Sequence, residues 1–185
     1  MRENETIKGD DFSSSALSQE YENCQFLNCD FTGVNLSNVK FITCEFEACN
    51  FTQTKWNNSS VQSCEFVACK MLGLDFSSLN PFLIRFSFEN CQLNFSSFFG
   101  LKIKGTPFIN CQLQEVDFSE TDLSKASFAE SDLKMATFDR TNLIETDFRT
   151  AINFSIDPTI NKMKKAKFAS NNLRGLLDTF SLKIT

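Results

Sequence analysis

The sequence predicts a four-sided parallel β-solenoid, because large apolar residues and cysteines both recur at multiples of five residues. This period matches neither the period of about 3.6 residues in a helix nor that of about two in a strand. A chain with such a period must turn a corner at every repeat. Four repeats then close a coil of about 20 residues, and successive coils pair as parallel strands about 4.8 Å apart.

The large apolar residues at the centres of the repeats form two unbroken series. The first comprises Tyr21, Phe26, Phe31, Leu36, Phe41, Phe46, Phe51, Trp56, Val61, Phe66, Met71 and Phe76. After two extra residues, the second comprises Leu83, Phe88, Leu93, Phe98, Ile103, Phe108, Leu113, Phe118, Leu123, Phe128, Leu133, Phe138, Leu143 and Phe148. We expect all of these centres to be buried. One face stacks a phenylalanine in every coil, and we call it the Phe-ladder face: Phe26, Phe46, Phe66, Phe88, Phe108, Phe128 and Phe148.

The eight cysteines occupy a second repeated position, two residues before a centre. They form two columns, with Cys24, Cys44 and Cys64 in one and Cys29, Cys49, Cys69, Cys91 and Cys111 in the other. The other residues at this position are mostly small, which suits a narrow interior. The spacing is unlike the CxxC pairs of zinc sites. We therefore expect eight reduced, buried thiols and no metal site.

The composition argues against several classes of function. There is no histidine, which removes the usual general base and the usual partner of a serine or cysteine nucleophile. We therefore expect no enzymatic activity and no cofactor. The net charge of −5 disfavours direct binding of nucleic acid. Because no apolar run is long enough to span a membrane and the first residues contain no secretion signal, we expect a cytoplasmic protein.

The repeat also predicts how the chain is divided. Residues 1–154 are expected to form the solenoid, and residues 155–185 a C-terminal capping segment. A short helix is expected near residues 172–180, with Asn171 or Asn172 as its N-cap. Its apolar stripe has helical spacing and must be buried against a partner surface: Leu173, Leu176, Leu177 and Phe180. The last five residues, 181–185, are compatible with a short strand.

At residues 117–148, the stretch DFSETDLSKASFAESDLKMATFDRTNLIETDF resembles the A(D/N)LXX consensus of pentapeptide-repeat proteins. This resemblance implies a right-handed quadrilateral solenoid. The alternation of Phe with Leu centres and the repeated cysteines resemble the Qnr- and MfpA-type subgroup, which protects DNA gyrase and includes quinolone-resistance and microcin-immunity proteins. Members of that subgroup are acidic rods that imitate duplex DNA. The resemblance thus implies gyrase or a related type II topoisomerase as partner, and a homodimer formed through the C-terminal helix.

The expected binding surface is the outer side of the Phe-ladder face. It carries six acidic residues against the single base Arg149, namely Glu45, Glu47, Glu65, Glu89, Glu130 and Asp147. A neighbouring face, centred on Phe41, Val61, Leu83, Ile103 and Leu123, is richer in bases, and we call it the Ile103 face. An acidic stripe of this kind suits a basic DNA-binding groove. It is also compatible with simple solubility, and a non-catalytic interaction scaffold with an unrelated partner is the alternative function.

The two-residue insertion lies within residues 77–82. Pro81 cannot donate a hydrogen bond to a ladder, and it stands where a small inward residue is expected. Four phenylalanines near the insertion lie off the central positions: Phe82, Phe86, Phe95 and Phe99. They are compatible with a binding loop, in which Pro81 and Phe82 contact a partner, and equally with the filling of a locally widened coil.

Overall fold

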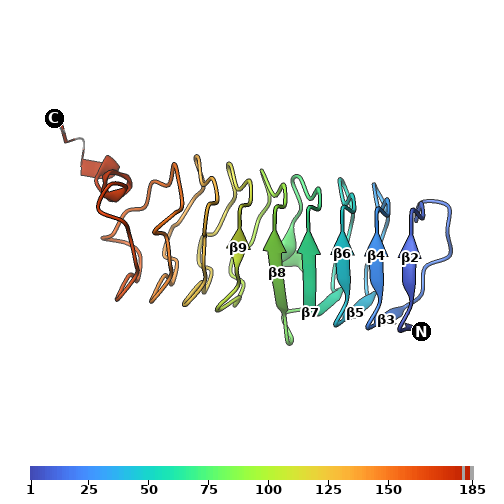
Figure 1. Ribbon diagram of the computed structural model, residues 1–185. Coiled ribbons are helices and arrows are strands. Elements are labelled where there is room, and N and C mark those ends of the chain that lie inside the picture. The colour runs from blue at the N-terminus through green and yellow to red at the C-terminus, as the bar shows by residue number, and fades with distance from the viewer. Residues whose placement is uncertain (181, 184–185) are drawn as a thin grey trace.

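The computed structural model describes residues 1–180 and 182–183, and these residues form a rod of stacked coils (Figure 1). The amino-terminal coil lies at one end of the rod and the carboxy-terminal segment at the other. The chain is nearly all strand and turn, and all strand pairs are parallel. The predicted parallel β-solenoid is therefore confirmed.

Among the described residues, nine short strands form one continuous sheet that folds around a corner of the rod. On the Ile103 face, β1 (Arg2–Glu3), β3 (Glu20–Glu22) and β5 (Lys40–Ile42) pair in order with the start of β7 (Ser60–Val67). On the Phe-ladder face, β2 (Thr6–Lys8), β4 (Gln25–Leu27) and β6 (Glu45–Glu47) pair with the end of β7. The sheet continues through β8 (Arg85–Glu89) to β9 (Phe108–Ile109). Isolated parallel bridges pair the coils elsewhere along the rod.

The core consists of the predicted centres, every one of which is buried except Leu83. Along the Phe-ladder face, neighbouring rings stack nearly parallel: the ring centroids of Phe26 and Phe46 are 4.7 Å apart, and those of Phe108 and Phe128 are 5.0 Å apart. The ladder extends past Phe148 to Phe168, at a centroid distance of 5.2 Å. Stacking at one ring per coil explains why phenylalanine dominates the aromatic content.

The Asp or Asn before many centres closes the outer turn of each repeat. Asp117 Oδ1 accepts a hydrogen bond of 2.9 Å from the N–H of Ser119, and Asp122 Oδ1 accepts one of the same length from Ser124. These bonds satisfy an N–H that faces outward and has no place in the ladder. The residue two after a centre commonly adopts a positive φ, as at Asn28 (54°), which asparagine tolerates well.

The inward slot two residues before each centre holds all eight cysteines, and all are buried free thiols. In this slot the side chain donates to a backbone carbonyl of the preceding coil. Cys49 Sγ lies 3.3 Å from the carbonyl oxygen of Phe26, and Thr121 Oγ1 lies 2.8 Å from that of Phe98. The slot therefore selects a small donor, which Cys, Ser and Thr all provide.

The insertion corrects two predictions about the core. Leu83 is 62% exposed at the tip of a turn, with a φ of 59°, so its prediction as a buried centre was wrong. Pro81 is also exposed, and the inward slot expected there is filled by Leu79. Phe86 is the register partner of Cys64, in the inward slot two residues before Phe88, and its buried ring fills the space of the missing centre with its centroid 5.0 Å from that of Phe88. The extra residues lengthen the loop, so the ladder shifts register between β7 and β8.

The C-terminal α-helix near residues 172–180 is not formed, and this prediction was wrong. Two 3₁₀ turns stand in its place, η2 (Leu173–Leu176) and η3 (Asp178–Phe180). The segment is pinned to the last coil, because the N–H of Ile156 donates to Gly175 O over 2.8 Å. Asn172 makes no N-cap hydrogen bond, and its Nδ2 donates instead to Phe148 O at 3.0 Å. These contacts and a helix-weakening glycine outweigh the helical pattern.

The remaining predictions about the chain's organisation concern its ends. Parallel bridges continue past residue 154, as far as Asp147 with Lys167, and the division of the chain at residue 154 stays a prediction. Residues 181, 184 and 185 lie outside the described residues, and with them most of the expected terminal strand. Within the described part of the chain, no helix has the length and apolar character needed to cross a membrane.

Candidate protein-interaction surface

The acidic residues of the Phe-ladder face project outward from adjacent coils. Glu45 and Glu65 are direct register partners on β6 and β7, and Glu47 continues through Val67 to Glu89 on β8. All four glutamates are exposed, and none forms an ion pair with a base in the described residues. Register partners lie about 4.8 Å apart, so their charges repel one another. This part of the rod therefore holds concentrated, uncompensated negative charge.

Asp147, farther along the same face, is compensated by neighbouring bases. Arg149 Nη2 lies 2.7 Å from Asp147 Oδ2, and Lys167 Nζ lies 3.9 Å from the same oxygen. The hydrogen bonds from Arg149 are the main reason that the pKa of Asp147 is lowered. Glu130 is exposed at a corner with a φ of 58°. The strongest negative potential on this face therefore lies over the coils of Glu45, Glu65 and Glu89.

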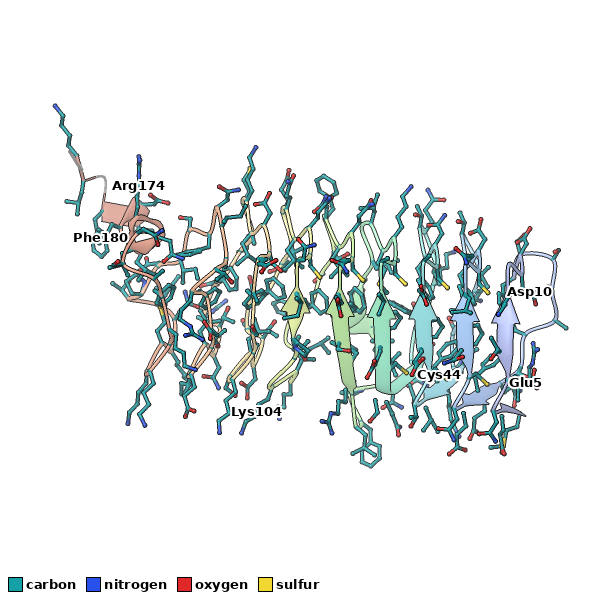
Figure 2. The ribbon with its side chains drawn as sticks, viewed as in Figure 1. Glu5, Asp10, Cys44, Lys104, Arg174 and Phe180 are labelled. Atoms are coloured by element: carbon teal, nitrogen blue, oxygen red, sulfur yellow. The ribbon has the colours of Figure 1, made fainter. Side chains whose placement is uncertain are left out.

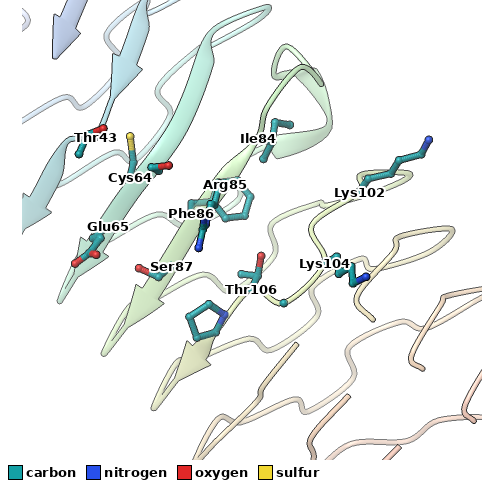
Figure 3. Close-up of a pocket in the computed structure, with 13 residues that line it drawn as sticks. Thr43, Cys64, Glu65, Ile84, Arg85, Phe86, Ser87, Lys102, Lys104 and Thr106 are labelled. Atoms are coloured by element: carbon teal, nitrogen blue, oxygen red, sulfur yellow. The ribbon is translucent and has the colours of Figure 1, made fainter. Parts of the chain in front are cut away.

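The adjoining corner carries an open groove with a different charge. The groove has a volume of about 890 Å³, with Arg85 on its middle strand, β8, and Lys102 and Lys104 along one side (Figure 3). Ile84 and Pro107 also line it. The sequence places these bases on the Ile103 face but does not reveal a groove. The sequence does contain one indication of an unusual site here, because Lys102 occupies the position before a centre that is usually Asp or Asn.

The insertion exposes large apolar side chains near the middle of the rod. In Figure 1 its loop extends beyond its neighbours just before β8. Phe82 is 68% exposed, Phe95 60% and Phe99 47%. Phe86 alone of the four off-centre phenylalanines is buried. The two interpretations of these phenylalanines, a binding loop and the filling of a widened coil, therefore apply to different residues. Phe86 fills the widened coil, whereas the rings of Phe82, Phe95 and Phe99 are exposed and available to a partner.

The proposed dimerisation residues do not share one exposed face. Leu173 and Phe180 are exposed, whereas Leu176 packs against the core and Leu177 is half-buried. Phe180 and Arg174 lie together at the carboxy-terminal tip of the rod (Figure 2). The 3₁₀ turns split the apolar stripe, because i and i+4 no longer align as they do in an α-helix.

The cysteine side chains lie in two buried columns inside the solenoid. In the described residues, no group of three or more His, Cys, Asp or Glu side chains is placed to hold a metal ion. Burial raises the pKa of the Cys64 thiol, which favours the protonated, unreactive form. The columns therefore act as core packing with hydrogen bonds to the backbone.

The coil, the repeated centres and the Asx-closed turns define a solenoid built from five-residue repeats. Two family models match the sequence: one described as a pentapeptide repeat region matches residues 80–148, and one described as pentapeptide repeats (8 copies) matches residues 21–47. Together these segments make up just over half of the chain. The chain belongs to the pentapeptide-repeat family.

Solved structures with the same fold include QnrB1, a plasmid-mediated fluoroquinolone resistance protein. The full-length QnrB1 structure matches with a TM-score of 0.61 at 17% identity, covering 98% of this chain and 99% of that one. HetL from the cyanobacterium Nostoc sp. strain PCC 7120, a pentapeptide-repeat protein involved in regulating heterocyst differentiation, matches with a TM-score of 0.55 at 12% identity. That match covers 86% of this chain and 85% of HetL. No curated protein sequence matches the chain.

Proposed function

We propose that this chain is a non-catalytic cytoplasmic protein that binds DNA gyrase or a related type II topoisomerase and protects or inhibits it, in the manner of quinolone- or toxin-resistance proteins. The observation that carries the proposal is the register pairing of Glu45 with Glu65, two unpaired acids on adjacent coils. Like charges held side by side cost stability. A surface that keeps them suits a partner with a positively charged groove.

The imitation of DNA by this surface is partial. Duplex DNA carries one charge per ~1.7 Å of its axis. The glutamate column offers one position per coil, at about 4.8 Å spacing. Binding should therefore be weaker than that of DNA and largely electrostatic. The fold shared with QnrB1 supports the rod shape that the proposal requires. The unpaired glutamates of the Phe-ladder face support a topoisomerase as the partner.

Two copies joined at their carboxy-terminal tips would double the length of this surface. Leu173 and Phe180 are exposed at that tip and favour an isologous contact between two chains. Leu177 is half-buried and would contribute its remaining surface, whereas Leu176 supports the tip from within. A homodimer would thus extend the acidic surface on both sides of a two-fold axis.

The test is direct binding to purified gyrase at low and high salt. We expect complex formation at low salt and a steep loss as salt rises, because exposed charges are screened beyond a Debye length of about 10 Å at 0.1 M. Competition with duplex DNA should also reduce the complex. Absence of binding, or binding insensitive to salt, would leave the alternative of an interaction scaffold with an unrelated partner.

A further inference from the structure

The groove beside Lys102 has a local chemistry unlike that of the acidic face. Its three cations are Arg85, Lys102 and Lys104, all exposed. None of them forms an ion pair in the described residues. Asp122 on the following coil is the register partner of Lys102, and its carboxylate offsets part of the positive charge there. Because no ion pair joins the two in the described residues, the three bases still leave positive charge available to an external anion.

The backbone beside Lys102 also departs from the rest of this face. On other coils, the residue before the centre donates its N–H to the preceding coil: Lys40 to Gln19, Ser60 to Val39, Asp122 to Leu101 and Asn142 to Thr121. The N–H of Lys102 has no hydrogen-bond acceptor in the described part of the chain. Lys102 has a bridge partner on the following coil, Asp122, but none among the described residues of the preceding coil, which carries the insertion.

The N–H of Lys104 also lacks a hydrogen-bond acceptor among the described residues, for a different reason. In regular repeats, the Asp or Asn before the centre accepts from the N–H of the residue after it, as Asp122 does from Ser124. Lysine at position 102 has no acceptor to offer. The N–H of Lys104 consequently lacks this bond in the described part of the chain. Two backbone donors thus accompany Lys102 and Lys104 on their side of the groove.

We propose that this groove, lined by Arg85, Lys102 and Lys104, binds an extended acidic peptide segment of a partner protein. Lys102 and Lys104 lie two residues apart, which is about 6.6 Å along an extended chain. Carboxylates at alternate positions of an extended peptide have the same spacing. The open backbone donors can hydrogen-bond to the peptide's carboxylate or carbonyl oxygens. Ile84 and Pro107 add apolar surface to the lining of the groove.

Glu65 limits where the peptide can lie. It lines the opposite side of the groove and would repel a carboxylate (Figure 3). The bound acidic side chains are therefore confined to the side of Lys102 and Lys104. The groove therefore adjoins the acidic surface of the Phe-ladder face, because Glu65 belongs to both, and one rod presents two neighbouring surfaces of opposite sign.

The test uses the full chain and a fluorescein-labelled nonapeptide in which glutamate and threonine alternate. Fluorescence anisotropy at low salt should detect binding, and a matched peptide with glutamine in place of glutamate should bind about tenfold more weakly or not at all. Inorganic phosphate and a short duplex DNA serve as competitors. Equal binding of the glutamine peptide, or displacement of the labelled peptide by either competitor at matched charge concentration, would overturn the proposal.

Three variants localise the site. Lys102→Glu with Lys104→Glu should weaken peptide binding by about tenfold or more, because the reversal replaces two attractions to the peptide's carboxylates with two repulsions. Lys55→Glu with Lys70→Glu changes the net charge equally at exposed positions outside the groove, and should leave binding unchanged. Lys102→Asn should cap the N–H of Lys104, raise thermal stability and still weaken binding. Equal losses in the two double variants would show a general charge effect and refute the groove.

Discussion

The thiol of Cys69 lies 3.3 Å from the carbonyl oxygen of Phe46, the ring-bearing residue of the coil before it. In the same column two coils after Cys91, Ser131 Oγ makes the equivalent bond to Phe108 O at 3.0 Å. A sulfur and an oxygen thus perform the same task at one repeated slot. The thiols are parts of the ladder, and all eight are buried inside the solenoid.

Replacement of Cys69 tests this equivalence. Cys69→Ser keeps a small donor near Phe46 O and should change the free energy of unfolding by no more than about 1 kcal/mol. Cys69→Leu removes the donor and overfills the slot, and should destabilise by about 1–3 kcal/mol. Urea unfolding followed by circular dichroism measures both. A serine variant less stable than the leucine variant would contradict the assigned hydrogen bond.

Phe86 should contribute far more to stability than Phe82, although both lie beside the insertion. Phe86 is 3% exposed and fills the core where a centre is missing, whereas Phe82 is 68% exposed. Phe86→Ala should cost about 3–5 kcal/mol. The matched Phe82→Ala variant should stay within about 0.5 kcal/mol of the parent. Comparable unfolding midpoints for the two variants would show that the ring of Phe86 does not stabilise the widened coil.

The sequence was sufficient to predict the coil because the repeat is local. Each centre is packed by residues one coil away, so the period alone determines which side chains point inward. The period fails to predict the core at the insertion. Leu83 continues the five-residue spacing of the centres, but Phe86 is the residue whose side chain fills the enlarged space. The choice between them depends on the volume and register of the neighbouring coils, which no five-residue pattern records.

The candidate surfaces were predictable only in part. The acidic positions follow from the repeat, since outward residues are known once inward ones are assigned. The pairing of Asp147 with Arg149 depends on side-chain geometry, and it removes one of the six acids from the effective charge. The groove beside Lys102 depends on an interrupted ladder between coils. The C-terminal helix failed because contacts of Gly175 with the last coil compete with a weak local preference.

Gly175 should be required for closing the carboxy-terminal end of the rod. A Cβ at this position would overlap the carbonyl oxygen and the ring of Phe154. Gly175→Ala should therefore displace the cap, at a cost of about 1–3 kcal/mol. Hydrogen exchange should show reduced protection of the Ile156 N–H, which bonds to Gly175 O. Ser170→Ala, at an exposed neighbouring site, is the control, and equal protection in both variants would refute the role.

Association of two chains should depend on the exposed apolar residues at the carboxy-terminal tip. Light scattering should give the mass of a dimer for the parent protein. Leu173→Asp with Phe180→Asp should give a monomer, because two charges would be buried in the contact. Phe99→Asp with Met135→Asp alters equally exposed residues elsewhere and should leave the dimer intact. A monomeric parent protein would remove the dimer from the proposal.

Reversal of the acidic surface is the decisive experiment for the proposed partner. Glu45→Lys, Glu65→Lys and Glu89→Lys together replace unpaired outward charges without touching the core. Binding to gyrase at low salt should fall by more than about tenfold, since each contact contributes up to ~1 kcal/mol and is replaced by repulsion. A control triple variant, Glu3→Lys with Glu115→Lys and Asp178→Lys, changes the net charge equally at positions off this surface. It should bind within about twofold of the parent, because screening confines each charge to its own neighbourhood. If the two triple variants bind alike, total charge and not the Phe-ladder face governs the interaction, and the DNA-mimic function fails.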